Sequence, residues 1–126
     1  EFEKAGIAFG NLLNNDADNP MLNYYYAASL TENGHYSNDV LNFFLKAGEN
    51  VTPQRFYYYL GIQHHALSHW EEALKYYEKL TEIYPDTSSS WLDLGIFYYN
   101  GQKYEKAIDY LKKAAELAPE DPEPIT

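Results

Sequence analysis

Three histidines near the middle of the chain come closest to the spacing of a chemical site. His65 and His69 are four residues apart, so on a helix they could share one face as two metal ligands do, and His64 precedes them directly. No third ligand is evident, and the glutamate that follows the first histidine of a metalloprotease helix is absent. A histidine near a helix C-terminus is also favoured by the helix dipole. We therefore expect no metal site here and place His69 in a turn between two helices.

The other polar motifs lack parts that their chemistry requires. Residues 15–19, Asn-Asp-Ala-Asp-Asn, resemble the start of a calcium loop, but a twelve-residue loop from Asp16 would end on Ala27 instead of a bidentate glutamate. The serine run 88–90 has no Gly-x-Ser-x-Gly elbow, and the sequence contains no glycine-rich phosphate loop. The adjacent Glu71 and Glu72 suit compensation of a helix dipole in its first turn. We expect no catalytic, metal or cofactor-binding residues, hence no cofactor and no enzymatic activity.

Composition narrows the classes of partner. The 126 residues hold 9 Lys plus Arg against 19 Asp plus Glu, a net charge of −10, which repels phosphate backbones and anionic lipid headgroups. Hydrophobic residues make up 45% and aromatics 17%, enough for a folded core. The absence of cysteine excludes disulfides and thiolate sites but suits the cytosol and the exterior alike. No apolar run approaches the roughly 20 residues needed to cross a bilayer. We expect neither nucleic acid nor a membrane as a partner.

Residues of the same type recur 34 positions apart in the second half of the chain. The pairs are Leu60 and Leu94, Gly61 and Gly95, Ala73 and Ala107, Tyr76 and Tyr110, and Pro85 and Pro119. Aromatic residues follow the same step at Tyr36, Trp70 and Tyr104, and Ala27 precedes Gly61 by the same interval. A fixed period of this length indicates stacked helical units.

The residue types at these positions suit helices that pack in close pairs. Glycine at 61 and 95 removes a side chain where two helices approach, and alanine at 73 and 107 does the same from the second helix. Large residues three or four apart form a stripe that fills the space between neighbours. Pro85 and Pro119 end the second helix of each pair. Asp86, Thr87 and Ser88 are suited to cap the helix that follows.

This pattern resembles the tetratricopeptide repeat, which reads Trp-x2-Leu-Gly-x2-Tyr, then Ala-x3-Phe, then Pro. The third repeat carries it with leucine in place of phenylalanine, as Trp91, Leu94, Gly95, Tyr98, Ala107, Leu111 and Pro119. The second repeat keeps the Leu-Gly, Ala and Pro positions and departs at His64, where the pattern has tyrosine. The first repeat is degenerate, with Tyr26, Ala27 and Leu30 at the Leu, Gly and Tyr positions.

The resemblance implies an all-α fold, a right-handed α-solenoid of antiparallel helix pairs with three repeats and one leading helix. We expect helices at 2–13, 20–32, 38–47, 53–66, 70–83, 88–99 and 104–117. Residues 1–126 would form one domain: 1–19 holds the second helix of an incomplete preceding repeat, 20–53, 54–87 and 88–121 are repeats one to three, and 122–126 is a tail. The partial first unit leads us to expect that the array extends further.

In the family, the first helix of each repeat lines a concave groove that holds a peptide or a partner helix. The resemblance places in that groove Tyr24, Arg55, Tyr58, Ile62, His65, Leu92, Ile96 and Tyr99. This strip is apolar and aromatic, which implies an apolar or amphipathic segment of another protein as the ligand. The sequence favours exposure of Tyr58 and Tyr99 but leaves open whether Ile62 and Ile96 are exposed or packed between helices. A chaperone-binding clamp is disfavoured, because these positions lack the required lysines and asparagines.

Two other functions remain open at this stage. The last helix would present Ile108, Leu111 and Ala115 with no following helix to cover them, which allows a homo-oligomer or a longer structural array. The chain could also be a regulatory appendage of a larger protein whose active domain lies outside it. Partner identity, pathway and compartment do not follow from the sequence.

Overall fold

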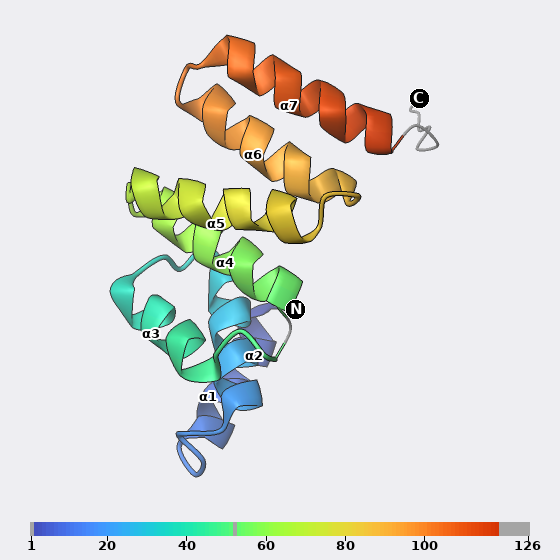
Figure 1. Cartoon of the computed structure of the whole chain (residues 1–126). Coiled ribbons are helices and arrows are strands. Elements are labelled where there is room, and N and C mark those ends of the chain that lie inside the picture. Colours follow the sequence, from blue (N-terminus) through green and yellow to red (C-terminus); the bar gives the residue numbers. More distant parts are fainter. Residues whose placement is uncertain (1, 52, 119–126) are drawn as a thin grey trace. The chain divides into compact units, whose positions relative to one another are not determined.

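The structure, a computed structural model, describes residues 2–51 and 53–118, and within them it contains only helices and turns (Figure 1). The helices are α1 (Phe2–Leu13), α2 (Pro20–Glu32), α3 (Asn38–Ala47), α4 (Pro53–Ala66), α5 (Trp70–Ile83), α6 (Ser88–Asn100) and α7 (Tyr104–Leu117). Every expected helix is confirmed, and the sixth extends one residue further than expected. Pro119 and the expected tail lie outside the described residues. None of the described helices combines the length and apolarity that a membrane span requires.

Contacts between Cα atoms divide the chain into two compact units. The N-terminal unit, Glu1–Ala73, holds α1 to α4 and the first turn of α5. The C-terminal unit, Leu74–Thr126, holds the rest of α5 with α6 and α7. Within the N-terminal unit α2 packs against α1 on one side and α3 on the other, and within the C-terminal unit α6 packs along α7.

Polar capping residues and a proline mark the first residues of α2 and α3. The side chain of Asn19 accepts a hydrogen bond from the Leu22 N–H at 3.1 Å, and Pro20 occupies the first position of α2. Ser37 caps α3 in the same way. The expected cap of α6 takes a different form, because Thr87 makes no side-chain capping bond. The hydroxyl of Ser88 instead donates to the carbonyl of Ala114 at 2.8 Å, which ties the start of α6 to the end of α7.

Three aromatic rings from three helices form the centre of the N-terminal unit. The Phe44 ring of α3 stacks on the Tyr59 ring of α4 with centroids 5.5 Å apart, and Tyr24 of α2 meets both edge-on at 6.1 Å. All three side chains are buried. Fully burying such a side chain is worth about 1.5–3 kcal/mol, and each favourable ring pair adds about 0.5–1.5 kcal/mol.

A buried amide connects α4 to the turn between α2 and α3. Gln63 is fully buried, and its Nε2 donates at 2.8 Å both to Thr31 Oγ1 and to the carbonyl of His35. Its Oε1 accepts from the N–H of Ser37 at 3.1 Å. The three bonds satisfy the amide and pair polar groups that burial would otherwise leave without partners.

The repeat positions expected to be small are buried, and at one of them two helices approach closely. Ala27, Ala73 and Ala107 are buried, and Gly95 of α6 faces Leu111 of α7. A Cβ placed on Gly95 would lie 2.7 Å from Leu111 Cδ2 and 2.9 Å from its Cγ, so only glycine allows this spacing. The close packing expected of this position is confirmed.

Candidate functional site

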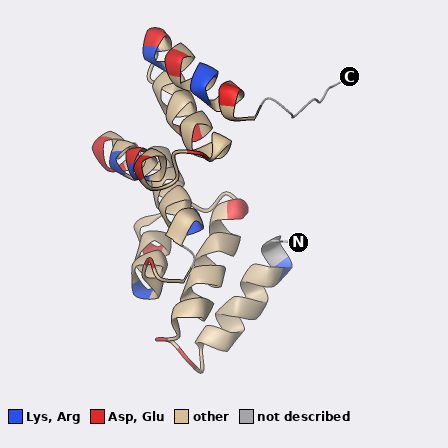
Figure 2. Cartoon of the chain, turned by 45° about the vertical axis from the view of Figure 1, so that its right-hand side comes forward, with Lys and Arg blue, Asp and Glu red and all other residues tan. Residues whose placement is uncertain are grey.

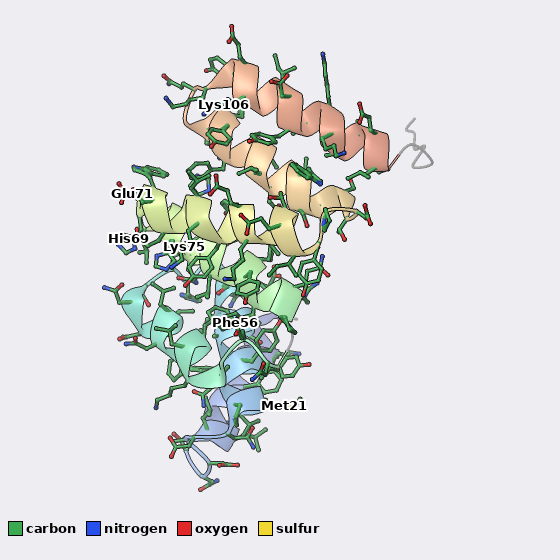
Figure 3. All side chains as sticks on the ribbon, viewed as in Figure 1. Met21, Phe56, His69, Glu71, Lys75 and Lys106 are labelled. Atoms are coloured by element: carbon green, nitrogen blue, oxygen red, sulfur yellow. The ribbon has the colours of Figure 1, made fainter. Side chains whose placement is uncertain are left out.

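The histidines gather at the turn between α4 and α5, where His69 lies beside the start of α5 (Figure 3). The two histidines that meet are His64 and His69, whose Nδ1 atoms are 3.0 Å apart, whereas His65 lies against the edge of Trp70 at 5.4 Å. The pairing of His65 with His69 that their spacing allowed is therefore not formed, and the predicted position of His69 in the turn is confirmed. The helix ends at Ala66, and Ser68 adopts a φ of 64°, so helical spacing no longer holds at position 69. Within the described residues no three His, Cys, Asp or Glu side chains are grouped to hold a metal ion.

Four of the predicted partner-binding residues share one face of α4. They are Arg55, Tyr58, Ile62 and His65, spaced by three, four and three residues. Arg55 is exposed and the other three are partly exposed. Burial lowers the pKa of the His65 imidazole, which favours its neutral form. We call these four residues the α4 face.

Arg55 is held by a short chain of hydrogen bonds. Its Nη2 donates to the Tyr59 hydroxyl at 3.3 Å, and that hydroxyl donates to Glu32 Oε2 at 2.7 Å. Burial, followed by the bond to Glu32, raises the pKa of Tyr59 to about 12, so its hydroxyl stays protonated and remains a donor. The bond to Tyr59 raises the pKa of Arg55 further. The guanidinium is thus a fixed positive charge at one end of the α4 face.

Tyr24, the predicted groove residue of the first repeat, does not lie on the surface. Its side chain is only 2% exposed, because its ring is enclosed by Phe44 and Tyr59. A partner could reach almost none of it. We therefore leave Tyr24 out of the candidate site.

The remaining three predicted residues form an exposed apolar line on α6. Leu92 and Ile96 are each 42% exposed and Tyr99 is 58% exposed. They are four and three residues apart, so they lie along one side of the helix. The Tyr99 ring meets the exposed ring of Tyr104 edge-on at 5.6 Å, which extends the apolar surface into the start of α7. We call Leu92, Ile96 and Tyr99 the α6 stripe.

Asp93 lies beside the α6 stripe and was not singled out from the sequence. It is the one charged residue of α6, whereas charges occur along the length of α7 (Figure 2). Its side chain is partly buried, and burial raises the pKa of its carboxyl to about 7. None of the described residues gives it a hydrogen bond or an ion pair. A single charge on an otherwise uncharged helix is the sequence signal that could have identified it.

Two hollows in the N-terminal unit were also not foreseen, and both are lined by Tyr26. One, of about 490 Å³, lies between α1 and α2, and the other, of about 630 Å³, lies between α2 and α3. Gly10 of α1 leaves room for the Tyr26 ring, because an added Cβ would lie 3.2 Å from it. Asn11, Asn14 and Asn33 line the first hollow, and Ser37, Asp39 and Asn42 line the second, so both offer hydrogen bonds to a ligand.

Comparison with known proteins places the repeat in a family. The sequence model described as tetratricopeptide repeat matches residues 60–122. The chain is 28% identical over 123 residues to Photosystem I assembly protein Ycf3 of Rippkaea orientalis, a match that covers 84% of this chain and 71% of that protein. It is 33% identical over 75 residues to Protein CTR9 homolog of Arabidopsis thaliana, which covers 57% of this chain and 7% of that protein.

Solved structures share the fold. The structure of MamA residues 41 to the end from Desulfovibrio magneticus RS-1 superimposes with a TM-score of 0.82 at 19% identity, over 97% of this chain and 69% of that one. A second MamA structure, MamA MSR-1 C2, gives a TM-score of 0.79 at 15% identity, over 96% and 70% of the two chains. At these identities the likeness concerns the fold alone. With a family match over half of its residues, the chain belongs to the tetratricopeptide repeat family, whose helical repeats serve as scaffolds for protein–protein interaction.

Proposed function

We propose that this chain binds a peptide or an amphipathic segment of a partner protein on the exposed faces of its first helices, without catalysing a reaction. The observation that carries the proposal is the exposure of the α6 stripe, three large apolar side chains in line on one helix. Contiguous apolar surface on a folded protein commonly marks an interaction site. The absence of a catalytic motif from the sequence agrees with a role in binding.

The α6 stripe has enough surface to contribute usefully to binding. Full burial of a leucine or isoleucine side chain is worth about 1.5–3 kcal/mol, so covering the exposed half of each yields about 1 kcal/mol. Tyr99 adds a ring that buries a large area and loses little conformational freedom. We include the α4 face as the corresponding contact surface of the N-terminal unit, with the Arg55 guanidinium as its polar anchor.

A peptide selection tests the proposal, because it can reveal binding sequences even while the natural partner is unidentified. A displayed library of random 12-residue peptides is selected on the purified chain, and the enriched peptides are synthesised and titrated by calorimetry. We expect Ile96→Ser and Tyr99→Ala each to weaken binding by about tenfold, because each removes apolar contact near the centre of the site.

The matched control is Ile83→Ser in α5. Ile83 is 47% exposed, close to the 42% of Ile96, and lies outside the α6 stripe. The substitution therefore changes the same residue type at similar exposure, and it should leave affinity unchanged. A failure to select any peptide, or equal losses at Ile83 and Ile96, would refute the proposed function.

Self-association through α7 is a second candidate, favoured by the 50% exposure of Ile108. Leu111, which the sequence also predicted to be exposed there, is partly buried against Gly95 and is unsuitable as a probe. Ile108→Glu is the better test. If light scattering shows a dimer that this variant converts to a monomer, the structural function gains support. A monomeric wild-type chain at about 100 μM would count against it.

A further inference from the structure

The carboxyl group of Asp93 is partly buried, and no described residue gives it a hydrogen bond or a counter-charge. A partly buried carboxylate has lost part of its hydration and is destabilised unless a cation or hydrogen-bond donors replace the water. No described residue supplies either one to Asp93. In the free protein only solvent or a bound proton compensates this carboxyl group, whereas a bound cation would stabilise its charged form.

Asp93 is also placed within reach of anything bound on the α6 stripe. It follows Leu92 directly and precedes Ile96 by three residues, which is the separation of neighbours on a helix surface, about 5–6 Å between Cβ atoms. A segment that covers these two apolar residues brings its own side chains to within contact distance of the carboxyl group. Since α6 carries no other charge, Asp93 is its single electrostatic determinant.

We propose that the segment bound on the α6 stripe is a basic amphipathic one, in which a lysine or arginine forms an ion pair with Asp93 while neighbouring apolar residues cover Leu92 and Ile96. The inference rests on the proposed function and specifies the partner class. An acidic segment would meet like charge, and a purely apolar one would bury Asp93 further without compensation, so both are selected against. The net charge of −10 acts in the same direction by attracting cationic segments from a distance.

The experiment uses the peptides selected on the wild-type chain. Lysine or arginine should be enriched next to apolar residues among them. Each selected peptide is then compared with a copy in which the basic residue is replaced by glutamine, on the wild-type chain and on Asp93→Asn. On wild type we expect the replacement to weaken binding by at least about tenfold, and on Asp93→Asn to have little effect, which defines a coupled pair.

Asp109→Asn is the matched control. Asp109 is an exposed aspartate of α7, so the substitution removes the same charge from the same unit away from the α6 stripe. It should weaken binding of the basic peptide far less than Asp93→Asn does. The small loss of affinity that Asp109→Asn causes should disappear as salt is raised, because the charge of Asp109 is exposed.

The outcomes separate the two proposals. Selected peptides that depend on Ile96 but show no basic preference, or equal effects of Asp93→Asn and Asp109→Asn, would overturn the ion pair and leave the binding function standing. If Ile96→Ser leaves the affinity of every selected peptide unchanged, both proposals fall. Enrichment of basic peptides whose basic residue is coupled to Asp93 supports both.

Discussion

Gly95→Ala is the substitution that tests most directly how α6 and α7 pack. The added Cβ would lie 2.7 Å and 2.9 Å from two carbons of the Leu111 side chain and 3.3 Å from its backbone nitrogen. Rotation of the Leu111 side chain can relieve the contact with Cδ2 but not the one with the backbone. The two helices must therefore separate or leave Leu111 in a poor rotamer.

The expected cost follows from two opposing effects. Overpacking of this kind destabilises by about 1–3 kcal/mol, whereas replacing glycine with alanine inside a helix stabilises by up to about 1 kcal/mol. We expect a net loss of about 1–2 kcal/mol in the free energy of unfolding, measured by urea denaturation followed by circular dichroism. Gly101→Ala is the control, because Gly101 has a φ of −86° and its added Cβ would meet only carbonyl oxygens at 3.6 Å. That variant should change stability by less than about 0.5 kcal/mol.

A double variant distinguishes a clash from other causes. Leu111→Ala alone should cost about 2–5 kcal/mol by leaving a cavity, and in the Gly95→Ala background the added methyl group should fill part of that space. The combined loss should therefore be smaller than the sum of the single losses. If Gly95→Ala is as stable as wild type, or if the two effects simply add, the inferred contact between Gly95 and Leu111 is refuted.

Three further predictions concern buried polar groups. Burial raises the pKa of Asp93 from 3.8 to about 7, so between these pH values the native state binds more protons than the unfolded state and the free energy of unfolding falls as pH rises. Asp93→Asn should remove this decline and stabilise the chain at pH 8 by about 1–2 kcal/mol. The whole pKa shift corresponds to about 4 kcal/mol, and we expect less because the carboxyl group is partly solvated. A pH profile of the variant that keeps the wild-type slope would contradict the assignment. Gln63→Leu should destabilise by about 2–4 kcal/mol in urea denaturation, since it leaves the Ser37 N–H and other polar groups of the turn unpaired, and a neutral result would show that water replaces the amide. Tyr59→Phe should cost about 1 kcal/mol by removing the bond to Glu32, and ultraviolet titration of the wild type should show one tyrosine that ionises near pH 12.

The helices could be predicted from the sequence because the residues that start and end them lie close to those positions in the sequence. Pro20 and Pro53 start helices, Asn19 and Ser37 cap them, and the 34-residue recurrence aligns the rest. These signals depend on backbone geometry within a few residues, so they hold whatever the neighbouring helices do.

The candidate site was less predictable because exposure depends on the neighbours. Tyr24 and Leu92 occupy the same position of their repeats, yet Tyr24 is 2% exposed and Leu92 is 42% exposed. The rings of Phe44 and Tyr59 enclose Tyr24. The 34-residue alignment specifies the side of the helix on which a residue lies but not what packs there.

The helical repeat, its period and the residues that must be small can be read from the sequence, since these follow from local backbone preferences and from spacing along one chain. The packing of the helices was needed to show which of their side chains are exposed, that His69 contacts His64, and that Asp93 is partly buried without a partner. The reason is that burial, and with it the pKa of a carboxyl group, depends on atoms brought close by packing from distant parts of the chain.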